Sequence, residues 1–196
     1  MADPAYIVDG VLTDGEAWVA LASTTLGADT ASITFTSTDD GQVGDWSQYM
    51  DLVLIAYAKG EMPANYDNGW IRLGTGGGSV DTGSNYPYQI LFANESVLVA
   101  ASGTHTGWYF RTLGTGSAAN EFAAVVVHMF DINSGKYKSA SNLVAADSDG
   151  DGFVRLSADT WKNQGAITSM ELTPGVGDFK AGSMFSLFGV LPRMVA

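Results

Sequence analysis

Short runs in which apolar and polar side chains alternate recur along this chain, and they restrict its possible folds strongly. The segment 32–36 places Ile33 and Phe35 on one side and polar residues on the other, and the segment 184–188 alternates Met184, Ser186 and Phe188 against Phe185 and Leu187. A period of two residues is the pattern of a β-strand with one buried face. Stretches rich in Gly, Ser, Asp and Asn separate the runs, as turns do. The pattern therefore predicts a protein built of strands and turns.

Two runs are apolar on both of the faces that a strand would present. They are residues 51–58 (DLVLIAYA) and 122–130 (FAAVVVHMF). Such runs are typical of central strands that are covered on both sides, or of strands at a subunit interface. The first run also fits helical spacing, but its β-branched residues favour a strand. Residues 16–29 are ambiguous, because their alanines favour a helix as well.

The pattern as a whole predicts an all-β fold. About ten strands in one unit fit a two-sheet β-sandwich of the jelly-roll type with long Gly-rich loops, one of them at residues 74–85. No repeat of fixed length and no long linker divides the chain, so residues 1–196 are expected to form a single domain. Residues 1–12 are a candidate N-terminal arm, and residues 191–196 a C-terminal tail.

Charge and cysteine content exclude several classes of function. Nine Lys and Arg against 21 Asp and Glu give a net charge of −12, which phosphate and anionic lipid would repel. Nucleic acid and membrane are therefore not expected as partners. The chain has no cysteine, and so no disulfide, thiol nucleophile or thiolate metal site. Its start has neither a basic segment nor an apolar run, so we expect no signal peptide and synthesis in the cytosol.

One motif suggests a metal site. Residues 147–152 (DSDGDG) place Asp147, Asp149 and Asp151 at alternate positions with a glycine at the sixth, as in the calcium loop of an EF-hand. The twelfth position is Ala158, where that loop needs a bidentate Glu, and Asp-Gly pairs are also common turn residues. A structural turn is the favoured interpretation, and a weak calcium site is the alternative. No cofactor is expected.

No catalytic constellation stands out. His128 lies within an apolar run and is expected to be a packed or cross-strand residue. His105 is expected in a loop, without a companion acid or nucleophile nearby in the sequence, and no nucleophile-elbow motif is present. The glycine-rich segment 74–79 lacks the Lys and the following helix of a phosphate loop. We therefore expect no enzymatic activity and assign no catalytic, cofactor-binding or metal residue.

Aromatic clusters and the apolar start of the chain are candidates for an interface. Rings gather at residues 85–92 (NYPYQILF) and 107–110 (GWYF), where they fit a core, a protein interface or a platform for sugars. Residues 5–12 (AYIVDGVL) are apolar and precede the main strands, which favours docking onto a neighbour. The candidate interface residues are Tyr6, Ile7, Val8, Tyr86, Tyr88 and Trp108.

Several segments resemble a group of jelly-roll virion proteins of tailed bacteriophages. They are DWSQYMDLVLIAY (45–57), DTGSNYPYQ (81–89), VVVHMFDINSGKYKS (125–139), Trp161 with AITSMEL (166–172), and FKAGSMFSLFGV (179–190). A glycine-rich stretch precedes the second segment, where that family often carries an Asn-Gly pair. The resemblance implies a capsid decoration (cement) protein or another accessory structural protein, commonly a trimer, and it brings no catalytic residue.

These observations lead to one main hypothesis and one alternative. We expect a structural virion protein that binds and stabilises the outer surface of a phage capsid. It would be a homotrimer on the capsid exterior, with the major capsid protein as its partner. The alternative is a host-recognition module of the tail or head that binds surface glycans through loop aromatics such as Tyr88 and Trp108. A polysaccharide-degrading enzyme is a remote third class.

Overall fold

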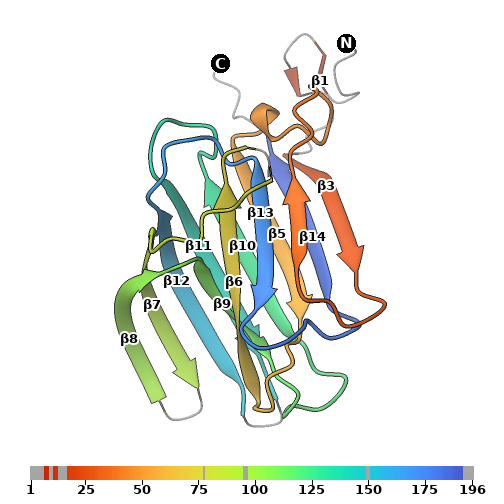
Figure 1. Ribbon diagram of the computed structural model, residues 1–196, viewed down its shortest axis with the longest axis vertical. Coiled ribbons are helices and arrows are strands. Elements are labelled where there is room, and N and C mark those ends of the chain that lie inside the picture. Colours follow the sequence, from red (N-terminus) through yellow and green to blue (C-terminus); the bar gives the residue numbers. More distant parts are fainter. Residues whose placement is uncertain are drawn as a thin grey trace.

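Two antiparallel β-sheets pack face to face in this protein (Figure 1). The computed structural model describes residues 7–8, 11–12, 17–76, 78–94, 97–148 and 151–191. From edge to edge, the large sheet contains β3 (Trp18–Thr25), β14 (Met184–Val190), β5 (Asp51–Ala58), β10 (Ala123–Phe130), β11 (Lys138–Ala146), β12 (Phe153–Trp161), β7 (Tyr86–Asn94) and β8 (Val97–His105). The small sheet contains β4 (Ile33–Thr36), β13 (Ser169–Pro174), β6 (Tyr66–Gly74) and β9 (Trp108–Leu113). The fold is the β-sandwich that the alternating pattern predicts.

Three short elements complete the described chain. The strands β1 (Ile7–Val8) and β2 (Val11–Leu12) pair with each other. A 3-10 helix, η1 (Trp46–Gln48), precedes β5, and the Asp45 carboxylate accepts a hydrogen bond from the Ser47 backbone N–H at its start. Within the described ranges, no helix has the length and apolar character needed to cross a membrane.

The order of the strands is that of a jelly roll with two added hairpins. Without β7, β8, β11 and β12, the sheets have the strand orders β3-β14-β5-β10 and β4-β13-β6-β9. These are the two four-stranded layers of an eight-stranded jelly roll. The hairpin β7–β8 is inserted between β6 and β9, and the pair β11–β12 between β10 and β13. Together they widen one layer from four strands to eight.

The core lies between the two sheets, and the alternation seen in the sequence accounts for much of it. Ile33 and Phe35 of β4 are buried as predicted, and Phe185 and Leu187 form the buried side of β14. The ambiguous segment 16–29 contains a strand, β3, and residues 51–58 form β5, so the prediction of a strand there is confirmed. The glycine-rich loop between β6 and β7 is also present, as expected.

The small sheet covers only part of the large one. Its edge strand β9 packs against β10, β11, β12 and β7, whereas β8 lies at the far edge and is exposed along most of its length. In Figure 1 the hairpin β7–β8 extends to one side of the sandwich. The added strands therefore extend the large sheet beyond the edge of the small sheet. Much of the candidate site lies on this extension.

Candidate functional site

Two of the predicted interface residues lie in the core. Tyr86 and Trp108 are each 1% exposed, and their rings meet edge to face. The Tyr86 hydroxyl accepts a hydrogen bond from the Leu73 N–H and donates one to the Asp81 carbonyl, each at 3.0 Å. Placing these two rings at an interface is wrong, because they fill the space between the sheets. In the sequence, Tyr86 is followed by Pro87 and Trp108 is preceded by Gly107, and neither neighbour indicates that the ring is buried.

The remaining predicted residues have different outcomes. Tyr6 lies outside the described residues, and for Ile7 and Val8 only the backbone of β1 is described. Tyr88 is half-buried and stacks on His105, with ring centroids 4.5 Å apart. His105 was expected in a loop, but it ends β8.

Tyr88 belongs to a cluster of four partly exposed rings, which we call the ring cluster. Trp70 lies 5.0 Å from His105 and 5.3 Å from Tyr109, measured between ring centroids. His105 and Tyr109 are 5.8 Å apart. The cluster forms where the inner side of β7–β8 meets the outer side of β6 and β9. Sequence reasoning missed Trp70, although its place opposite Ile71 in the alternating pattern predicts that it faces outward.

A buried network of polar hydrogen bonds lies behind the ring cluster. The Arg155 guanidinium donates from Nη1 to the Tyr109 carbonyl at 2.5 Å and to Ser157 Oγ at 3.2 Å. Ser157 Oγ in turn donates to Asp159 Oδ2 at 2.6 Å. Burial raises the pKa of Asp159 to about 6 and lowers the pKa of Arg155. Burial, together with the charge of Arg155, also lowers the pKa of His105.

These polar residues show that β12 buries its polar side and exposes its apolar side, the reverse of an ordinary surface strand. Arg155, Ser157 and Asp159 are buried between the sheets, whereas the apolar Val154 and Leu156 are about half exposed. A strand with one wet face normally buries its apolar side chains. On β12 the apolar side chains face solvent at the cost of burying a charged pair. Such a reversal points to a surface that is covered in the working protein.

The solvent side of the large sheet, here called the outer face, is apolar over six adjacent strands. Cross-strand pairing builds two rows. The first row, from β5 to β8, is Ile55, Val126, Leu143, Leu156, Leu91 and Ala100. The second row is Tyr57, Ala124, Ala145, Val154, Ala93 and Leu98. None of these twelve residues carries a charge.

The outer face explains the two runs that the sequence shows as apolar on both sides. β10 buries one set of side chains in the core and presents the other set on this face, and β5 presents Ile55 and Tyr57 there. Towards one end of the face the side chains become polar, and there His128 Nε2 lies 2.9 Å from Asp51 Oδ2 on β5. The prediction that His128 is a cross-strand residue is therefore confirmed.

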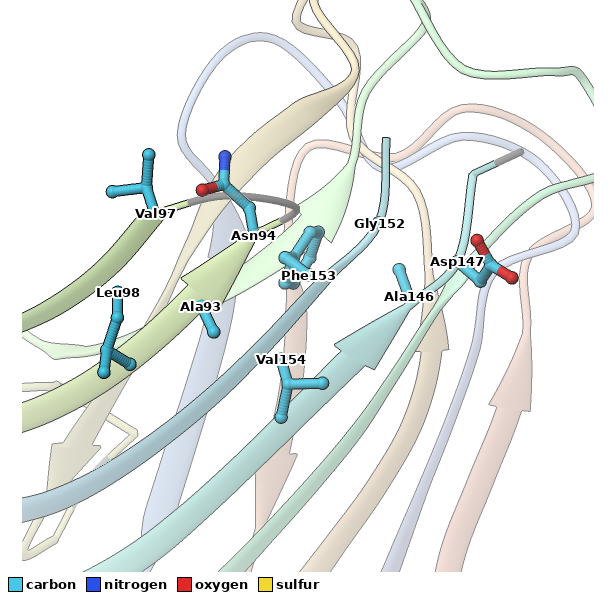
Figure 2. A pocket seen from close by; sticks show the side chains of 9 residues that line it. All are labelled: Ala93, Asn94, Val97, Leu98, Ala146, Asp147, Gly152, Phe153 and Val154. Carbon is cyan, nitrogen blue, oxygen red and sulfur yellow. The ribbon is translucent and has the colours of Figure 1, made fainter. Parts of the chain in front are cut away.

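Hollows mark the outer face and its rim. One, of about 620 Å³, lies at the ends of β7, β8, β11 and β12 (Figure 2). Figure 2 shows Ala93, Leu98 and Val154 on three neighbouring strands, with Asp147 at the far rim of the hollow. The second, of about 380 Å³, lies over β7 and β12 and includes Leu91 and Leu156 in its lining.

The candidate calcium loop falls partly outside the described residues, because Asp149 is not among them. Asp151 accepts a hydrogen bond from the Asn65 side chain, which ties the loop to the residues before β6. Where residues are described, no group of three or more His, Cys, Asp and Glu is arranged to hold a metal ion. The weak calcium site stays a prediction.

Comparison with known proteins adds little. No protein-family model matches the chain, and no curated protein matches it. One solved structure is similar: the CBM40 of the Ruminococcus gnavus IT-sialidase, bound to α2,6-sialyllactose. It is 7% identical over 89% of this chain and 95% of that chain, with a TM-score of 0.33. A similarity of this degree does not extend to function.

Proposed function

We propose that this protein is a structural component of a bacteriophage virion that binds the outer surface of the capsid through its outer face. The observation that carries the proposal is the reversal on β12, which exposes Val154 and Leu156 while Arg155 and Asp159 are buried. Apolar side chains exposed in this way are stabilised when a partner covers them. The virion assignment itself comes from the segments that resemble phage proteins.

The size of the outer face fits a protein interface. Six strands about 4.8 Å apart and two rows about 7 Å apart give roughly 400 Å² of apolar surface. That lies within the range of about 300–600 Å² for the largest apolar patch of a monomeric protein, and such a patch is often functional. With the polar rows beside it, the face approaches the roughly 800 Å² that each partner contributes to a stable interface.

The chemistry of the face also indicates what it fits. A chain with a net charge of −12 carries almost none of that charge on this surface. The matching surface on the partner, which we propose is the major capsid protein, is therefore flat and apolar. By binding the assembled shell more tightly than its separate subunits, the protein stabilises the shell. The homotrimer implied by the resemblance stays a prediction.

A matched pair of substitutions tests the outer face. Val154 on β12 is 54% exposed and Val176 in the loop after β13 is 47% exposed. Val154→Glu places a charge inside the proposed contact, whereas Val176→Glu places the same charge elsewhere. We expect Val154→Glu to weaken binding to shells that lack this protein by at least about tenfold, because the carboxylate must be desolvated. Val176→Glu should bind like the wild type.

The binding is measured by co-sedimentation with such shells, and the folding of each variant by its melting temperature. Leu156→Thr is a second variant that removes apolar area without adding charge, and it should weaken binding to a smaller extent. If Val154→Glu folds and binds shells as well as Val176→Glu does, the outer face is not the capsid-binding surface.

A second candidate function is glycan binding by the ring cluster, which four partly exposed rings in mutual contact favour. Trp108 cannot take part, since it is buried. Trp70→Ala and Tyr88→Ala would then abolish binding on a glycan array, and Val154→Glu would leave it unchanged. The opposite result, with shell binding intact in both ring variants, favours the capsid proposal.

A further inference from the structure

β8 forms an edge of the large sheet that is open within the described part of the chain. It pairs with β7 over nine residues and has no second neighbour. Figure 1 shows it as the outermost strand on its side of the molecule. The row of backbone N–H and C=O groups on its free side is a template for another strand.

Nothing in the sequence of β8 protects this edge. Val97–His105 contains no charged residue and no proline. Leu98 is 73% exposed, and Val97 and Val99 are exposed beside it. The pairing with β7 runs without a bulge from end to end. Proteins that stay monomeric normally guard a long edge with Lys, Pro, a bulge or a short strand.

The other edges of the two sheets do carry such protection. β4 has only four residues. β9 carries Arg111, whose guanidinium lies 4.1 Å from the centroids of the Tyr66 and Phe92 rings. β3 is uncharged, but its pairing with β14 contains a register shift at Leu187 and Phe188. Among these four edge strands, β8 is therefore the long, regularly paired strand without a charged residue, a proline or a bulge.

We propose that β8 pairs antiparallel with β8 of a second copy of this chain, about a two-fold axis, so that the two large sheets become one. Asn94 and Val97 pair directly although only two residues separate them along the chain, and a pair this close exchanges both backbone hydrogen bonds. Alternate residues further along β8 then direct their N–H and C=O groups away from β7. These are Leu98, Ala100, Ser102 and Thr104.

Continuity of the outer face favours a second copy over an unrelated strand. β8 is uncharged, so pairing two copies of it brings no like charges directly opposite each other. Ala100 and Leu98 end the two apolar rows of the outer face, so the pairing would continue both rows across the axis. This inference goes beyond the proposed function, since it holds whether or not the face binds a capsid.

Cysteine scanning tests the pairing directly, because the chain has no cysteine of its own. Single variants Leu98→Cys, Ala100→Cys, Ser102→Cys and Thr104→Cys are oxidised at micromolar concentration and run on a non-reducing gel. We expect a disulfide-linked species of twice the 20.6 kDa chain mass for one of them, or for two neighbours, nearest the axis. Ser139→Cys, on the same face of β11 but away from the edge, is the control and should stay unlinked.

A second experiment blocks the edge and measures the mass in solution. Ala100→Pro removes a donor that points away from β7, which an edge strand tolerates, and Ala100→Lys adds the missing guard. Ala100→Ser keeps the donor and is the control. By light scattering on a sizing column, the wild type and Ala100→Ser should be dimeric and the two blocked variants monomeric.

Three results would overturn the proposal. One is a wild type that is monomeric at tens of micromolar. Another is the trimer that the resemblance implies, because a two-fold pairing of one edge does not produce a trimer. The third is a dimer that persists in both Ala100→Pro and Ala100→Lys, or that crosslinks as readily through the control cysteine on β11. The variant Val154→Glu should remain dimeric, which separates this edge from the capsid-binding face.

Discussion

Asp159 shows how the reversal on β12 affects a single side chain. It lies buried on the inner side of the strand, and burial raises its pKa to about 6. The folded protein therefore holds this proton more tightly than the unfolded chain does. The stabilisation that the proton provides is complete below the unfolded pKa, near 4, and is lost as the pH rises through about 6.

We predict that Asp159→Asn removes this pH dependence. Relative to the variant, the wild type should lose up to about 3 kcal/mol of its free energy of unfolding between pH 4 and pH 7. Urea denaturation at four pH values across that range measures the difference. The variant also loses the charge that partners Arg155, which shifts its free energy of unfolding by the same amount at every pH. The prediction therefore concerns only how the difference in free energy of unfolding between the two proteins changes with pH.

Asp81 provides a control of opposite sign. Burial tends to raise its pKa, but hydrogen bonds from Trp161 Nε1, Asn85 Nδ2 and the Gly83 N–H lower it overall. Its contribution to stability is therefore present above the unfolded pKa and lost as the pH falls. Asp81→Asn should be less stable than the wild type at pH 7, and the difference in free energy of unfolding should be smaller at pH 3.

If the free energies of unfolding of the wild type and Asp159→Asn change in parallel with pH, the pKa assigned to Asp159 is contradicted.

At the scale of strands, the close packing of β6 against β9 depends on one glycine. Gly69 lies opposite Phe110, whose ring covers the glycine so closely that a Cβ there would be 2.3 Å from the ring. Gly69→Ala should therefore lower the free energy of unfolding by about 1–3 kcal/mol, because the buried ring must move. Gly27→Ala is the matched control, since a Cβ at that position meets nothing within 4 Å. Equal melting temperatures for the two variants would show that the ring adapts freely.

Alternation predicted the strands of the original jelly roll better than those of the added hairpins. On β4 the apolar side of the pattern is the buried side, as expected. On β12 the same rule gives the wrong face, because Val154 and Leu156 point outward and Arg155 and Asp159 inward. A period of two residues shows that a strand has two kinds of face but does not show which is covered. Only the pairing with β7 and β11 settles that.

The same limit applies to the candidate site. Aromatic residues near glycines and prolines predicted exposure for Tyr86 and Trp108, yet both rings lie in the core. The ring cluster joins β6, β7, β8 and β9, whose positions come from sheet topology rather than from local sequence. The outer face is also a product of register across six strands. Its one local sign was the pair of runs that are apolar on both sides.

For the whole molecule, the separation of charge from the outer face makes a prediction about salt. Contacts between opposite charges weaken as ionic strength rises, whereas burial of apolar area does not. Binding of the protein to capsid shells should therefore change by less than about threefold between 50 and 500 mM NaCl, because screening acts on charges that this face lacks. Sedimentation of shells with labelled protein at several salt concentrations measures the affinity. A loss of more than tenfold would point to a charged contact elsewhere on the molecule.

The position of β14 has a consequence for how the chain is made. This strand lies between β3 and β5, and Val190 pairs with both Trp18 and Asp51. While the ribosome is still synthesising the chain, β3 and β5 lack the strand that joins them, and long-range pairing of this kind forms slowly. Until β14 has emerged, β3 therefore has no partner strand and β5 keeps one open side. Removing β14 would separate β3 from the rest of the large sheet rather than trim an edge.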